Sequence, residues 1–162
     1  MQQNRKKPVV FVSSTCYDLK QVREDIKDFF EKDYGFEAML SEFDSFPINP
    51  CKGTFENCLG NVDNYADFFV LIVGTRYGYI TDVGKSITNL EYLHARAKGI
   101  PTFVFVNKQL YDSLPLWRSN PSGDFSSIVD NSQIYEFIAS IYRISEGDLQ
   151  RNSKYLCSRL QL

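Results

Sequence analysis

The sequence predicts an α/β protein in which helices cover both faces of a parallel sheet. Short apolar runs rich in Val, Ile and Phe alternate along the chain with segments whose apolar residues recur at helical spacing. The runs are apolar throughout rather than at every second residue, which is typical of strands buried on both faces. The length of 162 residues suits a single domain, 1–162, with one sizeable core.

Each element follows from its local pattern. Strands are expected at residues 8–14, 36–43, 67–75 and 100–107. Helices are expected at residues 15–35, 54–66, 86–99 and 132–145, with a last short helix toward Leu162. Thr15 and Asp18 resemble a capping box at the start of the first helix, and Gly99 ends the third. The polar residues 119–130, which include Pro, Gly and Ser, predict a loop.

Composition and charge exclude several classes of protein. A formal net charge of -2 gives no electrostatic drive toward nucleic acid, so no direct nucleic-acid binding is expected. No apolar run reaches the roughly 18 residues that a membrane span needs. The four cysteines have no C-x-x-C spacing and the chain has one histidine, so no metal site is expected. Reduced thiols of this kind indicate a cytoplasmic protein.

The strand order directs attention to three loops. A doubly wound sheet binds its ligands beyond the carboxyl ends of its strands, at the switch point in strand order. Residues 13–18, 41–53 and 74–91 are the loops that reach this edge. The third contains Gly84-Lys85-Ser86, but five residues separate Gly78 from Gly84 where a Walker A loop has four. A nucleoside triphosphatase is therefore not favoured.

Glu91 has two interpretations. Residues 88–91 fit the capping box S/T-x-x-E, in which Glu91 only caps a helix that begins near Thr88. Alternatively, a carboxylate at the first turn of this helix faces the switch-point crevice, where it can stabilise or attack a ribosyl cation. The helix N-terminus is expected to keep the carboxylate ionised, which favours a stabiliser or nucleophile over a general acid.

Neighbouring side chains can complete a nucleotide pocket, and each also has a purely structural interpretation. Ser13, Ser14 and Thr15 follow the first strand and can hold a ribose or phosphate, or they can cap the next helix. Tyr77 and Tyr79 can stack on a base or a nicotinamide ring, or pack against the crevice wall. Arg76 can bind a phosphate, or form a surface ion pair with Asp82.

Three segments of the chain together resemble a known family. The segments "VFVSSTCYDLKQVRED", "VLIVGTRYGYI" and "KSITNLEYLHARAKGIPTFVFV" resemble the domain of unknown function 4062 family, a TIR-like domain, over residues 9–106. The resemblance implies a flavodoxin-like sheet of about five strands in the order 2-1-3-4-5, akin to TIR domains and nucleoside deoxyribosyltransferases. Many enzymes of that wider group cleave N-glycosidic bonds with a glutamate on a helix after the third or fourth strand.

The resemblance also implies roles for individual residues. Glu91 matches the catalytic glutamate, and Ser86 and Thr88 match the hydroxyls that precede it. The family's R-Y-G motif is matched by Arg76, Tyr77 and Gly78. The chain lacks the W-C-x-x-E motif of the TIR enzymes proper.

The resulting hypothesis is a TIR-like domain that hydrolyses NAD+ or a related nucleotide in bacterial defence or innate-immune-type signalling. NAD+ would be the substrate, and no cofactor is expected. The first alternative is a non-catalytic homotypic interaction module, and the second is a deoxyribosyltransferase-like enzyme. Self-association is expected through residues 41–51, with Phe43 and Phe46 as apolar anchors. The family architecture suggests the N-terminal part of a longer protein, fused to or partnered with a sensor or NTPase module.

Overall fold

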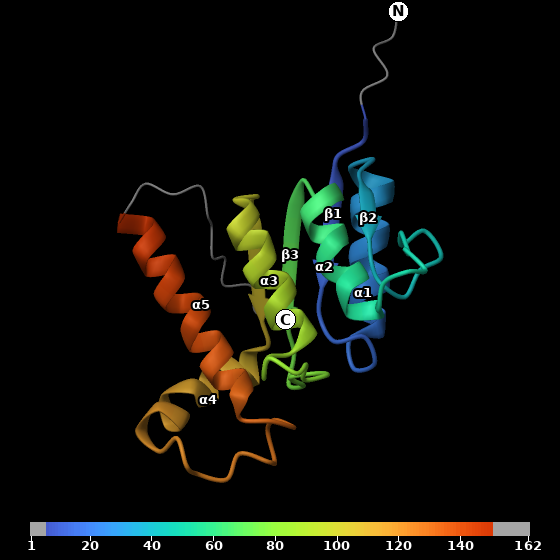
Figure 1. The fold of residues 1–162 in the computed structure, drawn as a ribbon. Coiled ribbons are helices and arrows are strands. Elements are labelled where there is room, and N and C mark those ends of the chain that lie inside the picture. Colours follow the sequence, from blue (N-terminus) through green and yellow to red (C-terminus); the bar gives the residue numbers. More distant parts are fainter. Residues whose placement is uncertain (1–5, 151–162) are drawn as a thin grey trace, which may run out of the picture.

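The computed structural model describes residues 6–150, which form one parallel sheet with helices on both of its faces (Figure 1). The strands are β1 (Val9–Ser13), β2 (Glu37–Met39), β3 (Phe68–Val73) and β4 (Thr102–Val106). They lie in the order β2-β1-β3-β4, and every neighbouring pair is parallel. The predicted α/β class is confirmed, and the order matches the first four positions of the expected 2-1-3-4-5 sheet.

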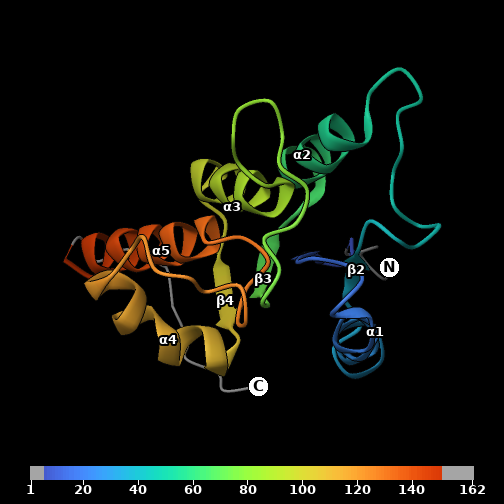
Figure 2. The same ribbon diagram turned by 90° about the horizontal axis from the view of Figure 1, so that it is seen from below.

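The helices are α1 (Lys20–Asp28), the π-helical turn η1 (Phe29–Asp33) that continues it, α2 (Thr54–Tyr65), α3 (Ile87–Lys98), α4 (Lys108–Ser119) and α5 (Gln133–Gln150). Figure 2 shows α1 on one side of the sheet and α2 and α3 on the other. No helix within residues 6–150 is long and apolar enough to cross a membrane.

The two faces of the sheet carry separate apolar clusters. On one face Phe11 and Phe69 stack with their ring centroids 5.7 Å apart, in a core to which α2, α3, α4 and α5 all contribute. On the other face Val10 and Ile72 pack against side chains of α1, such as Val22. Because both faces of β1 and β3 are buried, these strands are apolar at every position except Ser13, as the sequence pattern indicated.

The described part of the chain has four strands, whereas about five were expected. The residues that follow β4 turn at once into α4, because the Asn107 side chain accepts hydrogen bonds from the backbone N–H groups of Gln109 and Leu110. The sequence did not predict α4, which contains Pro115, a residue that normally ends a helix. The loop that follows α4 and the helix after it were both predicted. The last short helix expected toward Leu162 lies outside the described residues.

The starts of two helices differ from the sequence prediction. The first helix begins at Lys20 without a side-chain cap, so the capping box of Thr15 and Asp18 is wrong. In α3 the cap is Ser86, whose hydroxyl accepts a hydrogen bond from the backbone N–H of Asn89. The predicted end of α3 is confirmed, since Gly99 adopts the left-handed conformation with φ 75°.

Candidate functional site

A cavity of about 570 Å³ lies at the carboxyl edge of the sheet. Its walls come from the end of β1, from α1, from the first two turns of α2 and α3, and from the loops that follow β1, β2 and β3 and precede α5. In this strand order the switch point falls between β1 and β3, where two crossovers leave in opposite directions. The cavity therefore occupies the place where a doubly wound sheet binds its ligands.

Glu91 lies in the wall of this cavity and is buried. Its side chain projects from the second turn of α3 with 6% of the residue exposed, and the Ser13 hydroxyl donates a hydrogen bond to its Oε2 at 2.5 Å. Ser13 is the last residue of β1, so this bond joins a strand end to a helix 78 residues later. The capping interpretation of Glu91 is wrong, because Ser86 caps α3 and Glu91 lies one turn further along.

Burial also changes the ionisation of Glu91. It raises the pKa of the carboxyl group to about 7, although the Ser13 hydrogen bond and the Arg23 charge both favour the ionised form. The position near the helix N-terminus predicted an ionised group, but desolvation outweighs that effect. Burial and the adjacent carboxylate likewise raise the pKa of the Cys58 thiol to about 12, so Cys58 is a neutral neighbour. Near neutral pH, Glu91 is thus present in both protonation states.

Arg23 is the buried charge that the sequence analysis missed. It projects from α1 with 1% of the residue exposed, and it binds Glu42 through two contacts of 2.5 Å. Its Nη1 also donates to the Ser14 hydroxyl at 2.6 Å. A signal was present in the sequence: Arg23 is four residues after Leu19 and three before Ile26, within the apolar stripe of the helix. A charged residue in such a stripe requires a buried partner.

Arg76 is paired at the cavity with a residue from a distant loop. Its Nε lies 3.7 Å from Asp130 Oδ2, and both residues line the cavity. The alternative pairing with Asp82 is not the one observed. Asp130 Oδ1 also accepts a hydrogen bond from the backbone N–H of Tyr77 at 2.7 Å, which attaches the loop before α5 to the loop after β3. Nothing in the local sequence could indicate Asp130, because it is 54 positions away from Arg76.

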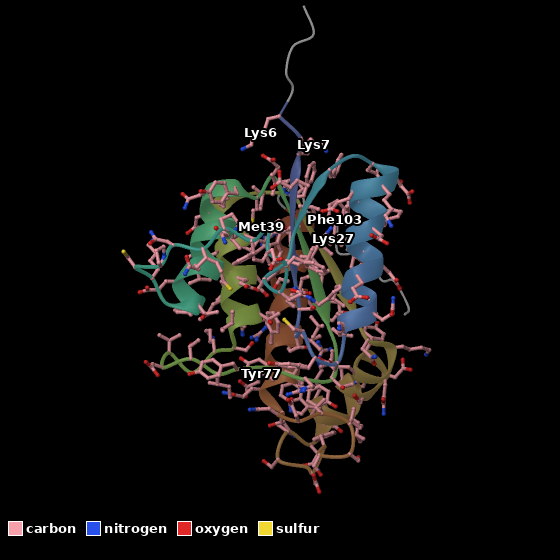
Figure 3. The ribbon with its side chains drawn as sticks, turned by 90° about the vertical axis from the view of Figure 1, so that its right-hand side faces the viewer. Lys6, Lys7, Lys27, Met39, Tyr77 and Phe103 are labelled. Atoms are coloured by element: carbon pink, nitrogen blue, oxygen red, sulfur yellow. The ribbon has the colours of Figure 1, made fainter. Side chains whose placement is uncertain are left out.

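Tyr77 and Tyr79 occupy different environments. Tyr77 lies at the end of the strands opposite Lys6 and Lys7 (Figure 3), but its ring is buried in the core and does not line the cavity. Its hydroxyl accepts a hydrogen bond from Asn89 Nδ2 at 3.3 Å. Tyr79 lines the cavity and is 73% exposed. Of the two tyrosines, Tyr79 is therefore the one placed to contact a ligand.

The structure brings most of the predicted site residues together. Those that line the cavity are Ser14, Thr15, Arg76, Thr88 and Glu91. Ser13 reaches the site through its hydrogen bond to Glu91, whereas Ser86 and Tyr77 do not line the cavity. The loops approach closely at Gly78, which has φ +84°; a Cβ there would lie 3.0 Å from Thr15 Cγ2.

The Thr15 hydroxyl is a buried polar group in the cavity wall. Thr15 Oγ1 is buried, and no atom of the described residues is its hydrogen-bond partner. Buried polar groups are normally paired, since an unpaired one costs about 1–3 kcal/mol. Together, the hydroxyls, the titratable carboxyl group and Arg76 form a cavity suited to a polar, partly anionic small molecule.

Comparison with known proteins gives the family of the chain. A family model described as Domain of unknown function (DUF4062) matches residues 9–152, which covers the sheet, the cavity and all the described helices. No curated protein and no solved structure matches the chain. The match extends the resemblance seen in residues 9–106 through α4 and α5. The chain therefore belongs to the family of the domain of unknown function DUF4062.

Proposed function

We propose that the protein is a TIR-like enzyme that hydrolyses the N-glycosidic bond of NAD+ or a related nucleotide, in the cytoplasm, as an effector of defence or innate-immune-type signalling. The observation that carries this proposal is Glu91, a buried carboxyl group in the wall of a cavity at the switch point. A buried ionisable group reduces stability, and such groups concentrate at functional sites. A homotypic interaction module needs no such group, so the enzyme is the better-supported hypothesis.

The proposed reaction uses the ionised form of Glu91. As the C1′–N bond breaks, its electron pair leaves with the nicotinamide, and positive charge develops on the ribose. Glu91 stabilises this cation or attacks it, while Ser13 holds Oε2 in place. Water then adds a hydroxyl group to C1′ and releases a proton, which gives ADP-ribose and nicotinamide. In this proposal Arg76 binds a phosphate and Tyr79 stacks on a ring, since both residues line the cavity.

The pairing of the acidic side chains favours a pyridinium substrate over a neutral nucleoside. Nicotinamide leaves NAD+ as a neutral molecule and needs no proton, whereas an uncharged purine leaves more readily after protonation by a general acid. Glu42 is held by Arg23 in a two-point contact that keeps its pKa low, and Asp130 lies beside Arg76. Glu91 is the cavity carboxyl group with a raised pKa, and its ionised form suits a leaving group that departs without a proton.

The test is nicotinamide release from NAD+ by the wild type and by Glu91→Gln, both in dilute solution and under conditions that force assembly. Glu91→Gln keeps the shape and the acceptor for Ser13 but removes the charge, so we expect a loss of about a hundred- to a thousand-fold in rate. The control is Glu56→Gln, which changes an exposed carboxylate that caps α2 and lies outside the cavity. A Glu91→Gln protein with wild-type turnover would end the catalytic role.

The pH profile separates the roles of Glu91 further. Because the ionised form is the reactive one, kcat/KM, which reports the free enzyme, should rise with pH and level off above the Glu91 pKa of about 7. A rate that falls over this range would instead identify Glu91 as a general acid.

The same assay separates the alternative functions. If the wild type forms no product in dilute solution or under conditions that force assembly, the interaction module is favoured. Base exchange between nucleosides would favour the deoxyribosyltransferase-like alternative.

A further inference from the structure

The Arg23–Glu42 ion pair lies directly behind the cavity. Arg23 lines the cavity from α1, and its guanidinium group contacts both carboxylate oxygens of Glu42 in the loop that follows β2. A two-point contact of this kind fixes orientation as well as distance. Glu42 keeps 30% of its side chain exposed, whereas the Arg23 side chain is 2% exposed. The arginine is therefore the buried member, and the glutamate is its compensating charge.

The same guanidinium group holds the end of β1. Its Nη1 donates to Ser14 Oγ at 2.6 Å and approaches the backbone oxygens of Val12 and Ser14 at 3.4 Å each. Ser13 lies between these two residues and donates to Glu91. One arginine thus fixes the backbone on both sides of the serine that contacts the candidate catalytic carboxylate.

We propose that Arg23 and Glu42 form a positioning pair for Glu91: Arg23 holds Ser13 and Ser14 in place and supplies the positive charge that favours the ionised carboxylate, and Glu42 limits that charge. This inference deepens the proposed function, on which its catalytic meaning rests. Arg23 is a positioning residue rather than a catalytic one, because it acts through Ser13 and through its charge.

Several charged or titratable groups line the cavity together with Glu91 or act on its carboxyl group. They are Cys16 from the loop after β1, Arg23 from α1, Glu42 from the loop after β2, Cys58 from α2, Arg76 from the loop after β3 and Asp130 from the loop before α5. Among them, Arg23 lowers the pKa of Glu91 and Glu42 raises it. Burial alone would raise the pKa of Glu42 itself, but the hydrogen bonds and charge of Arg23 hold it below its usual value.

The opposite signs give a sharp test. Arg23→Met and Glu42→Gln both break the ion pair, but the first removes a positive charge and the second a negative one. The titration of Glu91 can be followed by NMR in protein labelled with ¹³C at the glutamate carboxyl carbons, where its signal is the one missing from Glu91→Gln. We expect the midpoint to rise by about one pH unit in Arg23→Met and to fall by a smaller amount in Glu42→Gln.

A pair that serves only to stabilise the fold would lower the melting temperature in both variants and leave the midpoint of Glu91 unchanged. A fixed midpoint in both, or a shift of the same sign in both, overturns the proposal. If Arg23→Met does not fold, Arg23→Lys takes its place: it keeps the charge but loses the two-point contact, and the midpoint should stay within about half a pH unit of the wild type. A shift beyond that limit also overturns the proposal.

The titration needs no substrate, so it stands apart from the test of hydrolysis. If the wild type releases no nicotinamide but the midpoints shift in opposite directions, the positioning pair holds and the proposed reaction fails. If nicotinamide is released, the pH profile of kcat/KM, which reports the free enzyme, should move with the NMR midpoint in each variant.

Discussion

Glu91 keeps a titratable carboxyl group inside the protein, where Ser13 and Cys58 are its polar neighbours. The raised pKa means that folding favours the protonated form, so ionising the group in the native state opposes folding. An active site that needs this glutamate ionised near neutral pH therefore lowers the stability of the folded protein. The difference in stability between the wild type and Glu91→Gln measures this cost, because the substitution removes the charge and keeps the shape.

The pH dependence of stability follows from these values. The folded-state pKa of about 7 lies above the reference value of 4.5, so the contribution of Glu91 to stability is fully present below pH 4.5 and is lost as the pH rises through about 7. At pH 8, Glu91→Gln should be more stable than the wild type by an amount on the order of 3 kcal/mol, and near pH 4 the difference should vanish. Urea unfolding across this range measures it.

The relevant quantity is the difference between the two proteins, because other groups titrate equally in both. Glu56→Gln again serves as the control, and its difference from the wild type should not follow the Glu91 pattern. A wild type that matches Glu91→Gln at every pH would show that the carboxyl group is not desolvated in solution.

The elements are placed so that two loops remain free to line the cavity. Because α1 starts only at Lys20, residues 14–19 stay outside the helix. Ser14 and Thr15 therefore line the cavity instead of capping α1. In α3, capping by Ser86 leaves Thr88 in the first turn and available to the cavity. The position of each cap therefore decides which hydroxyls are structural and which can bind.

Two substitutions at the start of α3 separate the cap from the cavity wall. Ser86→Ala should lower the free energy of unfolding by about 1 kcal/mol, because the N–H of Asn89 loses its acceptor. Thr88→Ala should change it by no more than about 0.5 kcal/mol, because Thr88 caps nothing. Chemical denaturation of both variants measures the difference. A larger loss in Thr88→Ala than in Ser86→Ala would restore the sequence-based capping box.

At the scale of the whole molecule, the loop between β2 and α2 contributes Phe46 to the core. Phe46 is 6% exposed and meets Phe11 edge to face with centroids 6.1 Å apart, and Lys27 lies 5.2 Å from the ring centroid of Phe43. Phe46 is therefore not exposed as an anchor, and self-association through this loop stays a prediction. Ile48, 72% exposed, is the apolar residue that this loop presents to solvent.

Truncation of Phe46 and of Ile48 should lower the free energy of unfolding by very different amounts. Phe46→Ala should cost about 3–5 kcal/mol of stability, because it leaves a cavity against Phe11. Ile48→Ala should stay within about 0.5 kcal/mol of the wild type. Urea unfolding gives both values, and equal losses would contradict the packing described for the loop. Light scattering of Ile48→Asp then tests self-association through this loop in a folded protein.

The sequence by itself determined the fold class, the four strands, most of the helices and the identity of Glu91 as the central candidate. Strands buried on both faces must be apolar throughout, and helices must repeat their apolar residues at a fixed spacing, so both can be recognised locally. The glycine at the end of α3 was also predictable, because a left-handed residue strongly favours glycine.

The tertiary structure alone decided what surrounds Glu91 and in which state the carboxyl group is held. Ser13 and Arg23 are 78 and 68 positions away along the chain from Glu91, and the pairing of Arg76 with Asp130 spans 54. Local spacing carries no information about such contacts, which form only when crossovers bring strand ends together. Burial is likewise a property of the packed molecule, and it is burial that moves the pKa of Glu91 to about 7.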